Sequence, residues 1–231
     1  MKIQRIGLEK INGPLVYIKT PKDSIFDEQV ELALPNGEIR LGNIVTLSED
    51  FTVIQVYEGT NGMSCKGVKT EFTGSPLKLK LSKDMLGRIF DGAGRPIDGL
   101  GQINVQTERE IGGEPINPVA REYPKNFIET GISAIDGLMT LIRGQKLPIF
   151  SGSGINHNKL TEKIIRQANI KDESGFAIVF GLIGAEYETA EFFRKSFEEN
   201  GILDKVVTFQ NLSNDPSIER ILTPKVALTC A

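Results

Sequence analysis

Histidine and cysteine are almost absent from this sequence, which leaves few ligands for a metal ion. His157 is the only histidine, and the two cysteines, Cys65 and Cys230, lie far apart without the spacing of a metal site. No second histidine, cysteine or carboxylate stands near His157 at ligand spacing, so we predict neither a metal site nor a general base there. Two widely separated cysteines are more typical of reduced thiols in a cytosolic protein than of a disulfide framework.

Long apolar segments and an excess of charge of one sign are lacking as well. Residues 1–14 contain no apolar run of signal-peptide length, and the longest apolar stretch, residues 176–185, is too short to span a bilayer. The 27 basic and 30 acidic side chains give a net charge of -3, so the sequence has no electrostatic footprint for nucleic acid or an anionic membrane. If the protein works at a membrane, another component must hold it there.

Short runs rich in β-branched residues, broken by turns, fill residues 13–72. They read PLVYIKT, QVELAL, EIRLGNIVTL, FTVIQVYEG and CKGVKTEF. Asn36-Gly37 predicts a type I′ hairpin, in which both central residues need positive φ. Five or six strands at this spacing predict a small closed antiparallel barrel, a shape that leaves no exposed sheet edge.

Glycine and proline crowd the next part of the chain, from residue 74 to residue 124. Such a stretch is extended and rich in turns, and it can pack as an ordered connector without forming a domain. We therefore place the join between two domains in this segment.

After Phe127 the hydrophobic period indicates alternating helices and strands. We expect helices over 132–142, 159–170 and 186–201, and strands over 145–151, 175–184 and 205–212. Leu160, Ile164, Ile165 and Ala168 would share one helical face, as would Ala190, Phe193 and Phe197. Gly201 is the expected C-cap of the third helix, and Asp215 followed by Pro216 is the expected start of a last one.

This alternation predicts a parallel sheet with helices on its faces. Three strands are few for a doubly wound domain. The sequence is therefore expected to be the front part of a longer protein.

The loop SGSGINHNKL, between the strand expected over 145–151 and the next helix, has the shape of a phosphate-binding loop without its chemistry. A working loop of this kind reads G-x-x-x-x-G-K-[ST], with backbone N–H groups around the phosphates, a lysine on the β- and γ-phosphates and a hydroxyl on Mg²⁺. The four defining positions hold Ser151, Asn156, His157 and Asn158 instead. Gly152 and Gly154 still permit a tight turn at the helix N-terminus.

The missing lysine and hydroxyl decide what the loop can do. A histidine supplies no fixed positive charge at neutral pH, so triphosphate binding should be weaker by orders of magnitude. We predict a degenerate loop with weak or no nucleotide binding, made of Ser151, Gly152, Ser153, Gly154, Asn156, His157 and Asn158. His157 is expected to make local hydrogen bonds, and Asn158 to cap the helix. A dinucleotide fingerprint, G-x-G-x-x-G, fails because its third glycine would fall on His157.

Five stretches together resemble the B subunit of V-type and archaeal-type rotary ATPases. They are FTG (72–74), SKDMLGRIFDGAGRPIDG (82–99), GEPINPVAREYP (113–124), IETGISAIDGLMTLIRGQKLPIFSGSG (128–154) and NLSNDPSIERILTPKVALT (211–229). The resemblance covers essentially the whole chain in order.

The resemblance implies an N-terminal six-stranded antiparallel β-barrel followed by the first part of a P-loop-type α/β nucleotide-binding domain. On that basis we expect the barrel over 1–74, a turn-rich connector packed on the α/β domain over 75–126, and a truncated α/β domain over 127–231. The rest of that domain and a C-terminal helical domain would be missing.

The same resemblance implies a non-catalytic, regulatory role. In that family three B subunits alternate with three catalytic A subunits in a hexameric head, around a central stalk and beside a peripheral stalk. The head lies at the cytoplasmic face of a membrane, and ATP synthesis or hydrolysis is coupled to H⁺ or Na⁺ transport. The implied partners are these subunits, not nucleic acid, with the membrane reached only through the ion-translocating sector. No cofactor is firmly implied for this chain; ATP or ADP would bind at subunit interfaces of the full complex.

The glutamate that polarises the attacking water in the catalytic A subunit is matched here by Ala185. Glu186 and Glu188 are near in sequence, but a shift of one residue turns a side chain to the other face of a strand. The arginine that the family's B subunit extends into the neighbouring catalytic site is expected beyond Ala231. Surface or subunit-contact roles are therefore predicted for Arg143, Arg166, Arg194 and Arg220.

Two other functions remain open from sequence alone. One is a weak nucleotide or anion sensor, which a loop closed by its own side chains would count against. The other is a self-sufficient P-loop ATPase related to flagellar or secretion ATPases or to the Rho helicase; those relatives keep the lysine that His157 replaces.

Overall fold

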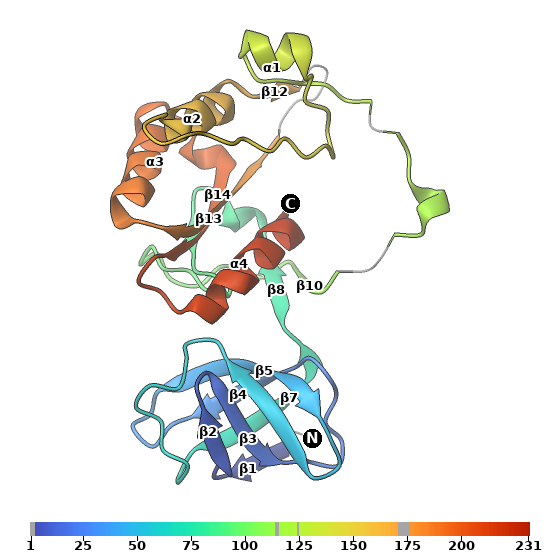
Figure 1. Cartoon of the computed structure of the whole chain (residues 1–231), viewed down its shortest axis with the longest axis vertical. Helices are drawn as coiled ribbons and strands as arrows, with labels where there is room; N and C mark the ends of the chain where they lie inside the picture. The colour runs from blue at the N-terminus through green and yellow to red at the C-terminus, as the bar shows by residue number, and fades with distance from the viewer. Residues whose placement is uncertain (1–2, 114–115, 124, 171–175) are drawn as a thin grey trace.

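The chain folds into two lobes (Figure 1). The computed structural model describes residues 3–113, 116–123, 125–170 and 176–231. The N-terminal lobe is built of antiparallel strands, and the second lobe combines a parallel sheet with helices. The chain passes between them once, at the start of β8 (Lys78–Leu81). Residues 114–115 and 124 of the predicted connector lie outside the described residues, as do residues 171–175, the last of which begins the strand predicted over 175–184.

Seven antiparallel strand segments form the N-terminal lobe, in the order β1-β7-β4-β5-β6-β3-β2. Their bounds are β1 (Ile3–Ile6), β2 (Lys10–Asn12), β3 (Leu15–Lys19), β4 (Glu28–Ala33), β5 (Ile39–Leu47), β6 (Phe51–Val56) and β7 (Lys69–Pro76). The two end segments, β1 and β2, belong to one stretch of chain that bends at Gly7, where φ is +87°. Its first half pairs with β7 and its second half with β3, so the bend closes the sheet.

The six-stranded barrel is therefore confirmed, with its first strand split in two by this bend. Between the halves, Gly7 donates to the carbonyl of Val68 at 2.8 Å, and Glu9 donates to the carbonyl of Tyr17 at 2.8 Å. Buried residues alternate along β4 and through most of β5, as a closed sheet requires. The buried core consists of Leu8, Val16, Ile18, Val30, Leu32, Ile44, Ile54, Val56, Val68 and Phe72.

The hairpin between β4 and β5 is present, but the predicted type I′ turn is wrong. The N–H of Gly37 donates to the carbonyl of Leu34 at 3.0 Å, which places Pro35 and Asn36 at the centre of the turn. Gly37 has φ +87°, whereas Asn36 is not among the residues with positive φ. Proline holds φ near -65° at the first central position, so the turn begins one residue earlier than Asn36-Gly37 indicated.

The connector contributes strands to the second lobe. It contains β8, η1 (Lys83–Met85), β9 (Ile89–Phe90), β10 (Thr107–Glu110) and η2 (Pro118–Ala120). β8 pairs with β10 antiparallel, and β9 pairs in parallel with β14 (Val206–Leu212). Leu79, Met85 and Phe90 are buried in one cluster with Val207, Phe209 and Val226 of the second lobe.

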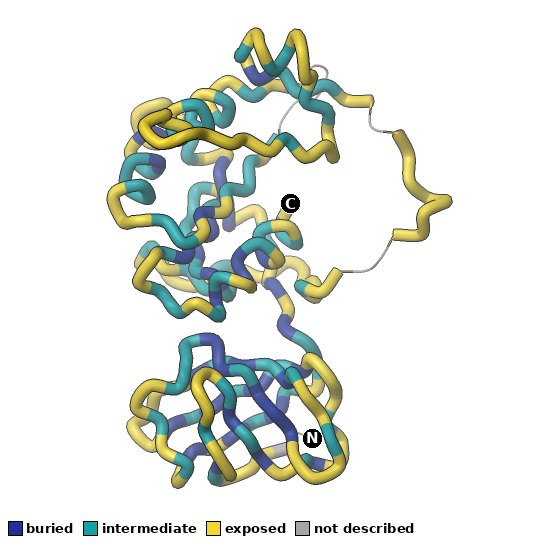
Figure 2. The backbone as a smooth tube through the Cα atoms, in the orientation of Figure 1, coloured by how far each residue is buried: buried dark blue, intermediate teal, exposed yellow. Residues whose placement is uncertain are grey.

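The second lobe is a parallel sheet in the order β13-β14-β9, with helices on both faces. Its other elements are β11 (Ile128–Glu129), α1 (Ser133–Leu138), α2 (His157–Gln167), β12 (Asn169–Ile170), β13 (Ile178–Ala185), α3 (Tyr187–Glu199), η3 (Leu203–Lys205) and α4 (Ser217–Cys230). Val207 and Phe209 pack with Val226 of α4, whereas Val206 packs with Phe193 and Phe197 of α3. Because neighbouring side chains of a strand point to opposite faces, α4 and α3 cover opposite sides of β14. Figure 2 shows the buried segments concentrated in this sheet and in the barrel.

Helix α3 ends as the sequence predicted. Gly201 has φ +64°, its N–H donates to the carbonyl of Glu198 at 3.1 Å, and the N–H of Ile202 donates to the carbonyl of Phe197 at 3.1 Å. These two bonds form a Schellman motif, which satisfies carbonyls that the helix leaves unpaired.

Three further local predictions are wrong. No strand forms over 145–151; Pro148 has no N–H for a strand hydrogen bond, and no described strand pairs with this segment. The helix expected over 132–142 is only six residues long. Asp215 does not cap α4, because its carboxylate accepts the N–H of Leu212 at 2.7 Å and the helix begins after Pro216.

Candidate functional site

The predicted phosphate loop is exposed, and the chain before it is irregular. Residues 151–157 are all exposed, and the preceding Phe150 is 92% exposed. In working phosphate loops a strand delivers the chain to the loop and fixes where the helix N-terminus points. Here the loop has no such support.

The start of α2 is capped by Asn156, and the prediction that Asn158 is the cap is wrong. The Asn156 Oδ1 atom accepts the N–H of Lys159 at 3.1 Å, and α2 begins at the next residue, His157. Asn158 lies inside the first turn and is half-buried. An N-cap side chain must bond two or three residues ahead, and Asn156 stands at that spacing from Lys159.

The loop is closed by its own groups. Ser151 Oγ lies 3.1 Å from Nδ1 of His157, which gives the histidine the local hydrogen bond that the sequence predicted. The N–H of Ile155 donates to the carbonyl of Gly152 at 3.3 Å, and Gly154 adopts φ +86°, a conformation that favours glycine. The turn therefore survives, while its two ends are joined by a serine and a histidine where a phosphate would need a fixed cation.

A small cavity of about 150 Å³ lies beside the loop, between the first turns of α2 and α3. Asn156 and Asn158 line one side, and Glu186, Glu188, Thr189 and Phe192 line the other. The charged groups in this lining are two carboxylates. They repel a phosphate from the helix N-termini that would otherwise attract it, so the residues present do not fit a nucleotide triphosphate.

Ala185 ends β13 at the position that the resemblance assigns to the catalytic glutamate. The β13–β14 register shifts between Ile183 and Ala185, and Gly184 between them has φ +64°. Ala185 packs against the apolar cluster of Leu182, Phe193, Phe197 and Val206. Glu186 and Glu188 are exposed and lie past the strand end, so neither occupies the position of Ala185.

Side-chain contacts within the second lobe are formed by Arg166, Arg194 and Arg220. Arg220 donates to Asn211 Oδ1 at 2.9 Å, Arg194 pairs with Glu191 and Glu198, and Arg166 pairs with Glu162 at 3.3 Å. Arg143 is exposed and its N–H donates to the carbonyl of Asn126 at 2.8 Å. Surface or subunit-contact roles for these arginines stay a prediction.

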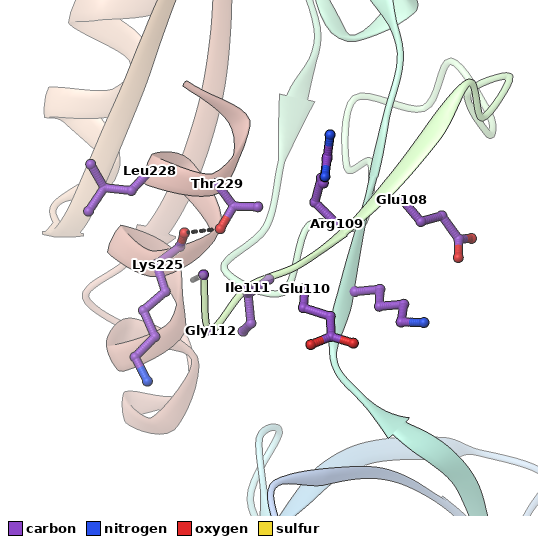
Figure 3. A pocket seen from close by; sticks show the side chains of 10 residues that line it. Glu108, Arg109, Glu110, Ile111, Gly112, Lys225, Leu228 and Thr229 are labelled. Carbon is purple, nitrogen blue, oxygen red and sulfur yellow. Dashed lines mark hydrogen bonds between the residues drawn. The ribbon is translucent and has the colours of Figure 1, made fainter. Parts of the chain in front are cut away.

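A larger cavity, about 730 Å³, lies between β10 and α4. The lining comes from Glu108, Arg109 and Glu110 of β10 and from Lys225, Leu228 and Thr229 of α4, and Figure 3 shows Ile111 and Gly112 between these two elements. Helix α4 contributes its C-terminal turns, whose free carbonyls disfavour anions. Together with the mixed charge, this makes the cavity a poor site for a nucleotide.

Sequence reasoning missed two carboxylates that organise the second lobe. Asp136 accepts the N–H and hydroxyl of Thr130 and the N–H of Gly131, and the Thr130 hydroxyl in particular lowers the pKa of Asp136. Glu219, on α4, is 5% exposed and pairs with Arg95 at 2.8 Å. The signals available were the spacing Thr130-Gly131…Asp136 and the turn sequence DGAGR, both of which lie within the stretches that carry the resemblance.

No described helix is both long enough and apolar enough to cross a membrane. Within the same described ranges, no group of three or more histidine, cysteine, aspartate or glutamate side chains could hold a metal ion.

The chain combines a closed antiparallel barrel with a parallel sheet and a glycine turn ahead of α2. This arrangement defines the class of protein, and the chain belongs to the ATP synthase alpha/beta family. Residues 9–74 match that family's beta-barrel domain and residues 131–231 its nucleotide-binding domain.

Within the family, the chain is similar to a V-type beta chain, which confirms the resemblance inferred from its motifs. It is 50% identical over 234 residues to the V-type ATP synthase beta chain 2 of Clostridium tetani (strain Massachusetts / E88). The alignment covers 100% of this chain and 51% of that protein, so the chain spans about half the length of this curated relative.

Proposed function

We propose that the chain belongs to a non-catalytic, regulatory B-type subunit of a V/A-type rotary ATP synthase or ATPase. The observation that carries the proposal is the loop before α2, where Ser151 and His157 bond to each other in place of a lysine that would hold phosphate. Ala185, which packs in an apolar cluster, supports it independently, because a methyl group cannot polarise an attacking water. Two catalytic elements built from different residues are thus missing from one chain.

In this proposal the subunit alternates with catalytic A subunits in a hexameric head and contacts the central and peripheral stalks. The head couples ATP synthesis or hydrolysis to the transport of H⁺ or Na⁺, at the cytoplasmic face of a membrane that this subunit reaches only through the ion-translocating sector. Nucleic acid is not a partner, and ATP or ADP binds at interfaces that the catalytic subunit shares with this one. The proposed boundaries remain 1–74 for the barrel, 75–126 for the connector and 127–231 for the truncated α/β domain.

Phosphate release from Mg²⁺-ATP tests the non-catalytic assignment. The chain should show no turnover, and neither should the variant carrying His157→Lys with Asn158→Thr, because Ala185 still supplies no carboxylate. Turnover by the unmodified chain would overturn the proposal and favour the self-sufficient ATPase.

Association with a catalytic A subunit tests the structural half of the proposal. The chain should co-elute with that subunit in gel filtration, and the double variant at His157 and Asn158 should co-elute equally, because its changes lie at the loop. Separate elution of the unmodified chain at micromolar concentrations would contradict it.

The anion-sensor alternative receives no support from the loop geometry. Ser151 and His157 already satisfy each other, and Glu186 and Glu188 line the neighbouring cavity. An anion sensor would need Ser151 and His157 to be free to donate hydrogen bonds to the anion. It would also need cationic side chains where Glu186 and Glu188 line the cavity.

A further inference from the structure

The turn Asp91–Arg95 is held by several hydrogen bonds and has no part in the proposed function. One Asp91 oxygen accepts the N–H groups of Ala93 and Arg95, at 3.0 and 2.8 Å, and the other accepts Nε of Arg95 at 2.6 Å. The turn lies tight against α4, since a Cβ atom at Gly92 would come within 2.6 Å of Thr223 Oγ1 and 2.8 Å of the Glu219 carbonyl. Glycine is therefore required there, and the turn holds Arg95 in one orientation.

Arg95 joins three carboxylates from three parts of the chain. Besides Asp91 in its own turn, its guanidinium bonds Glu58, just beyond barrel strand β6, and Glu219 of α4 at 2.8 Å. The second oxygen of Glu58 accepts the N–H of Leu41 in the barrel at 2.9 Å. One arginine side chain thus connects the backbone of the barrel to a helix of the second lobe.

Arg95 lies where the two lobes contact each other. Tyr57 of the barrel, Leu77 of the crossing segment and Leu222 of α4 form a small buried cluster between the lobes. Beside it lies an open cleft of about 340 Å³, lined by Thr73, Ser75 and Pro76 on the barrel side and by Arg95 itself. With one covalent crossing and a small apolar contact, the relative position of the lobes depends strongly on this ion cluster.

We propose that the Glu58–Arg95–Glu219 cluster is a proton-sensitive latch that holds the barrel against the second lobe. Three carboxylates surround one guanidinium, so the cluster has more negative than positive charge when all three are ionised. Ionisation is least favourable for Glu219, because its side chain is the most deeply buried of the three. Protonating it leaves Glu58 and Asp91 to neutralise Arg95 and relieves the repulsion among the three. The latch goes beyond the proposed function and does not depend on the degenerate loop.

The direction of the pH response follows from Glu219. Burial, followed by the charge of Asp91, raises the pKa of Glu219 to about 7; Glu58 and Asp215 add to the rise and Arg95 opposes it. When the lobes part, Glu58 leaves and water enters, so the pKa of Glu219 falls back toward its ordinary value. The extra stability that protonation of Glu219 gives to the latched state is fully present below about pH 4.5. It declines as the pH rises and is lost above about pH 7.

Distance measurements between two spin labels on the whole chain test the latch. Cys65 and Cys230 are first replaced by serine, and labels are placed at the exposed positions Glu49, in the barrel, and Lys195, on α3. The distribution of distances should be narrow near pH 5.5 and about twofold broader near pH 8.5. An unchanged width over this range would overturn the proposal.

Two variants and a matched control distinguish the latch from a general loss of stability of the chain. Glu219→Gln should keep the narrow distribution at both pH values, because the amide stays neutral, and Arg95→Gln should give the broad one at both. Glu198→Gln, which removes an exposed partner of Arg194, should behave as the parent does. A pH response retained in Glu219→Gln contradicts the latch. If Arg95→Gln fails to give the far-ultraviolet circular dichroism spectrum of the parent, Arg95→Lys replaces it and should lie between the parent and the broad state.

Discussion

At the residue scale, the difference between a turn and a binding site rests on single side chains. Gly154 keeps the left-handed conformation that the turn before α2 needs, while His157 bonds Ser151. The shape of a phosphate loop depends on glycine, but its affinity depends on a lysine and a hydroxyl that this chain lacks. We therefore expect the loop to keep the outline of a phosphate site with weak or no binding of a nucleotide.

Asp98 gives a prediction about acid stability at the same scale. It forms a two-pronged ion pair with Arg88, with Nη2 of Arg88 at 2.8 Å from Oδ1, and this pairing lowers the pKa of Asp98 to about 2. The stabilisation is present above the ordinary aspartate pKa and is lost as the pH falls toward about 2.

Asp98→Asn should cost about 2 kcal/mol near pH 7, because Arg88 loses its charged partner, and the cost should shrink as the pH falls. Urea unfolding at several pH values measures this. Glu198→Gln, at an exposed ion pair, is the control and should change stability little. A cost for Asp98→Asn that stays the same down to pH 2 would show that the pairing is not its source.

At the element scale, local signals predicted which elements exist better than where they begin. Strands β3 to β7, β13 and β14 and helices α2 and α3 were predicted from periodicity, whereas β1 and β2 lie before the runs that predicted the barrel. The strand predicted over 145–151 was wrong because a strand is stabilised by the strands beside it. A short apolar run carries no information about whether such a neighbouring strand exists. The caps of α2 and α4 were misplaced by one or two residues, since asparagine and aspartate side chains near a helix start can bond backbone groups inside or outside the helix, as Asp215 does with Leu212.

The C-terminus of α3 provides a test of a correctly predicted element end. Gly201→Ala should destabilise the chain by about 1 kcal/mol, because alanine is strained at φ +64°. Gly152→Ala is the matched control, since Gly152 is absent from the positive-φ glycines and a Cβ there meets nothing within 4 Å. Equal stability losses for the two variants, measured by urea unfolding, would contradict the Schellman assignment.

At the scale of the whole molecule, the two lobes and their order were predictable, but their joint was not. Most barrel strands and two strands of the parallel sheet, β13 and β14, follow from patterns within short windows of sequence, whereas the third strand, β9, comes from the predicted connector. Arg95 and Glu219 lie 124 positions apart, and only the folded chain brings them together. The turn DGAGR was visible in the sequence as a glycine-rich connector, without any sign of what it would contact.

Leu222 tests the apolar part of this joint. Leu222→Ala should lower stability by about 3 kcal/mol, because a buried side chain between the lobes is replaced by a cavity. Leu228→Ala on the same helix, where the side chain is 77% exposed, should change stability by less than about 0.5 kcal/mol. Similar values for the two variants in differential scanning calorimetry would show that the cluster of Tyr57, Leu77 and Leu222 does not hold the lobes together.

The measurement that tests the central claim most directly is a calorimetric titration of the chain with Mg²⁺-ATP. The loop before α2 lacks a cation and is closed by Ser151 and His157, and Glu186 and Glu188 line the cavity beside it. We predict no saturable binding at micromolar ATP and no change after Gly154→Ala, which strains the turn without touching its polar groups. Saturable micromolar binding that Gly154→Ala abolishes would contradict the account, since it would place a working nucleotide site in this loop.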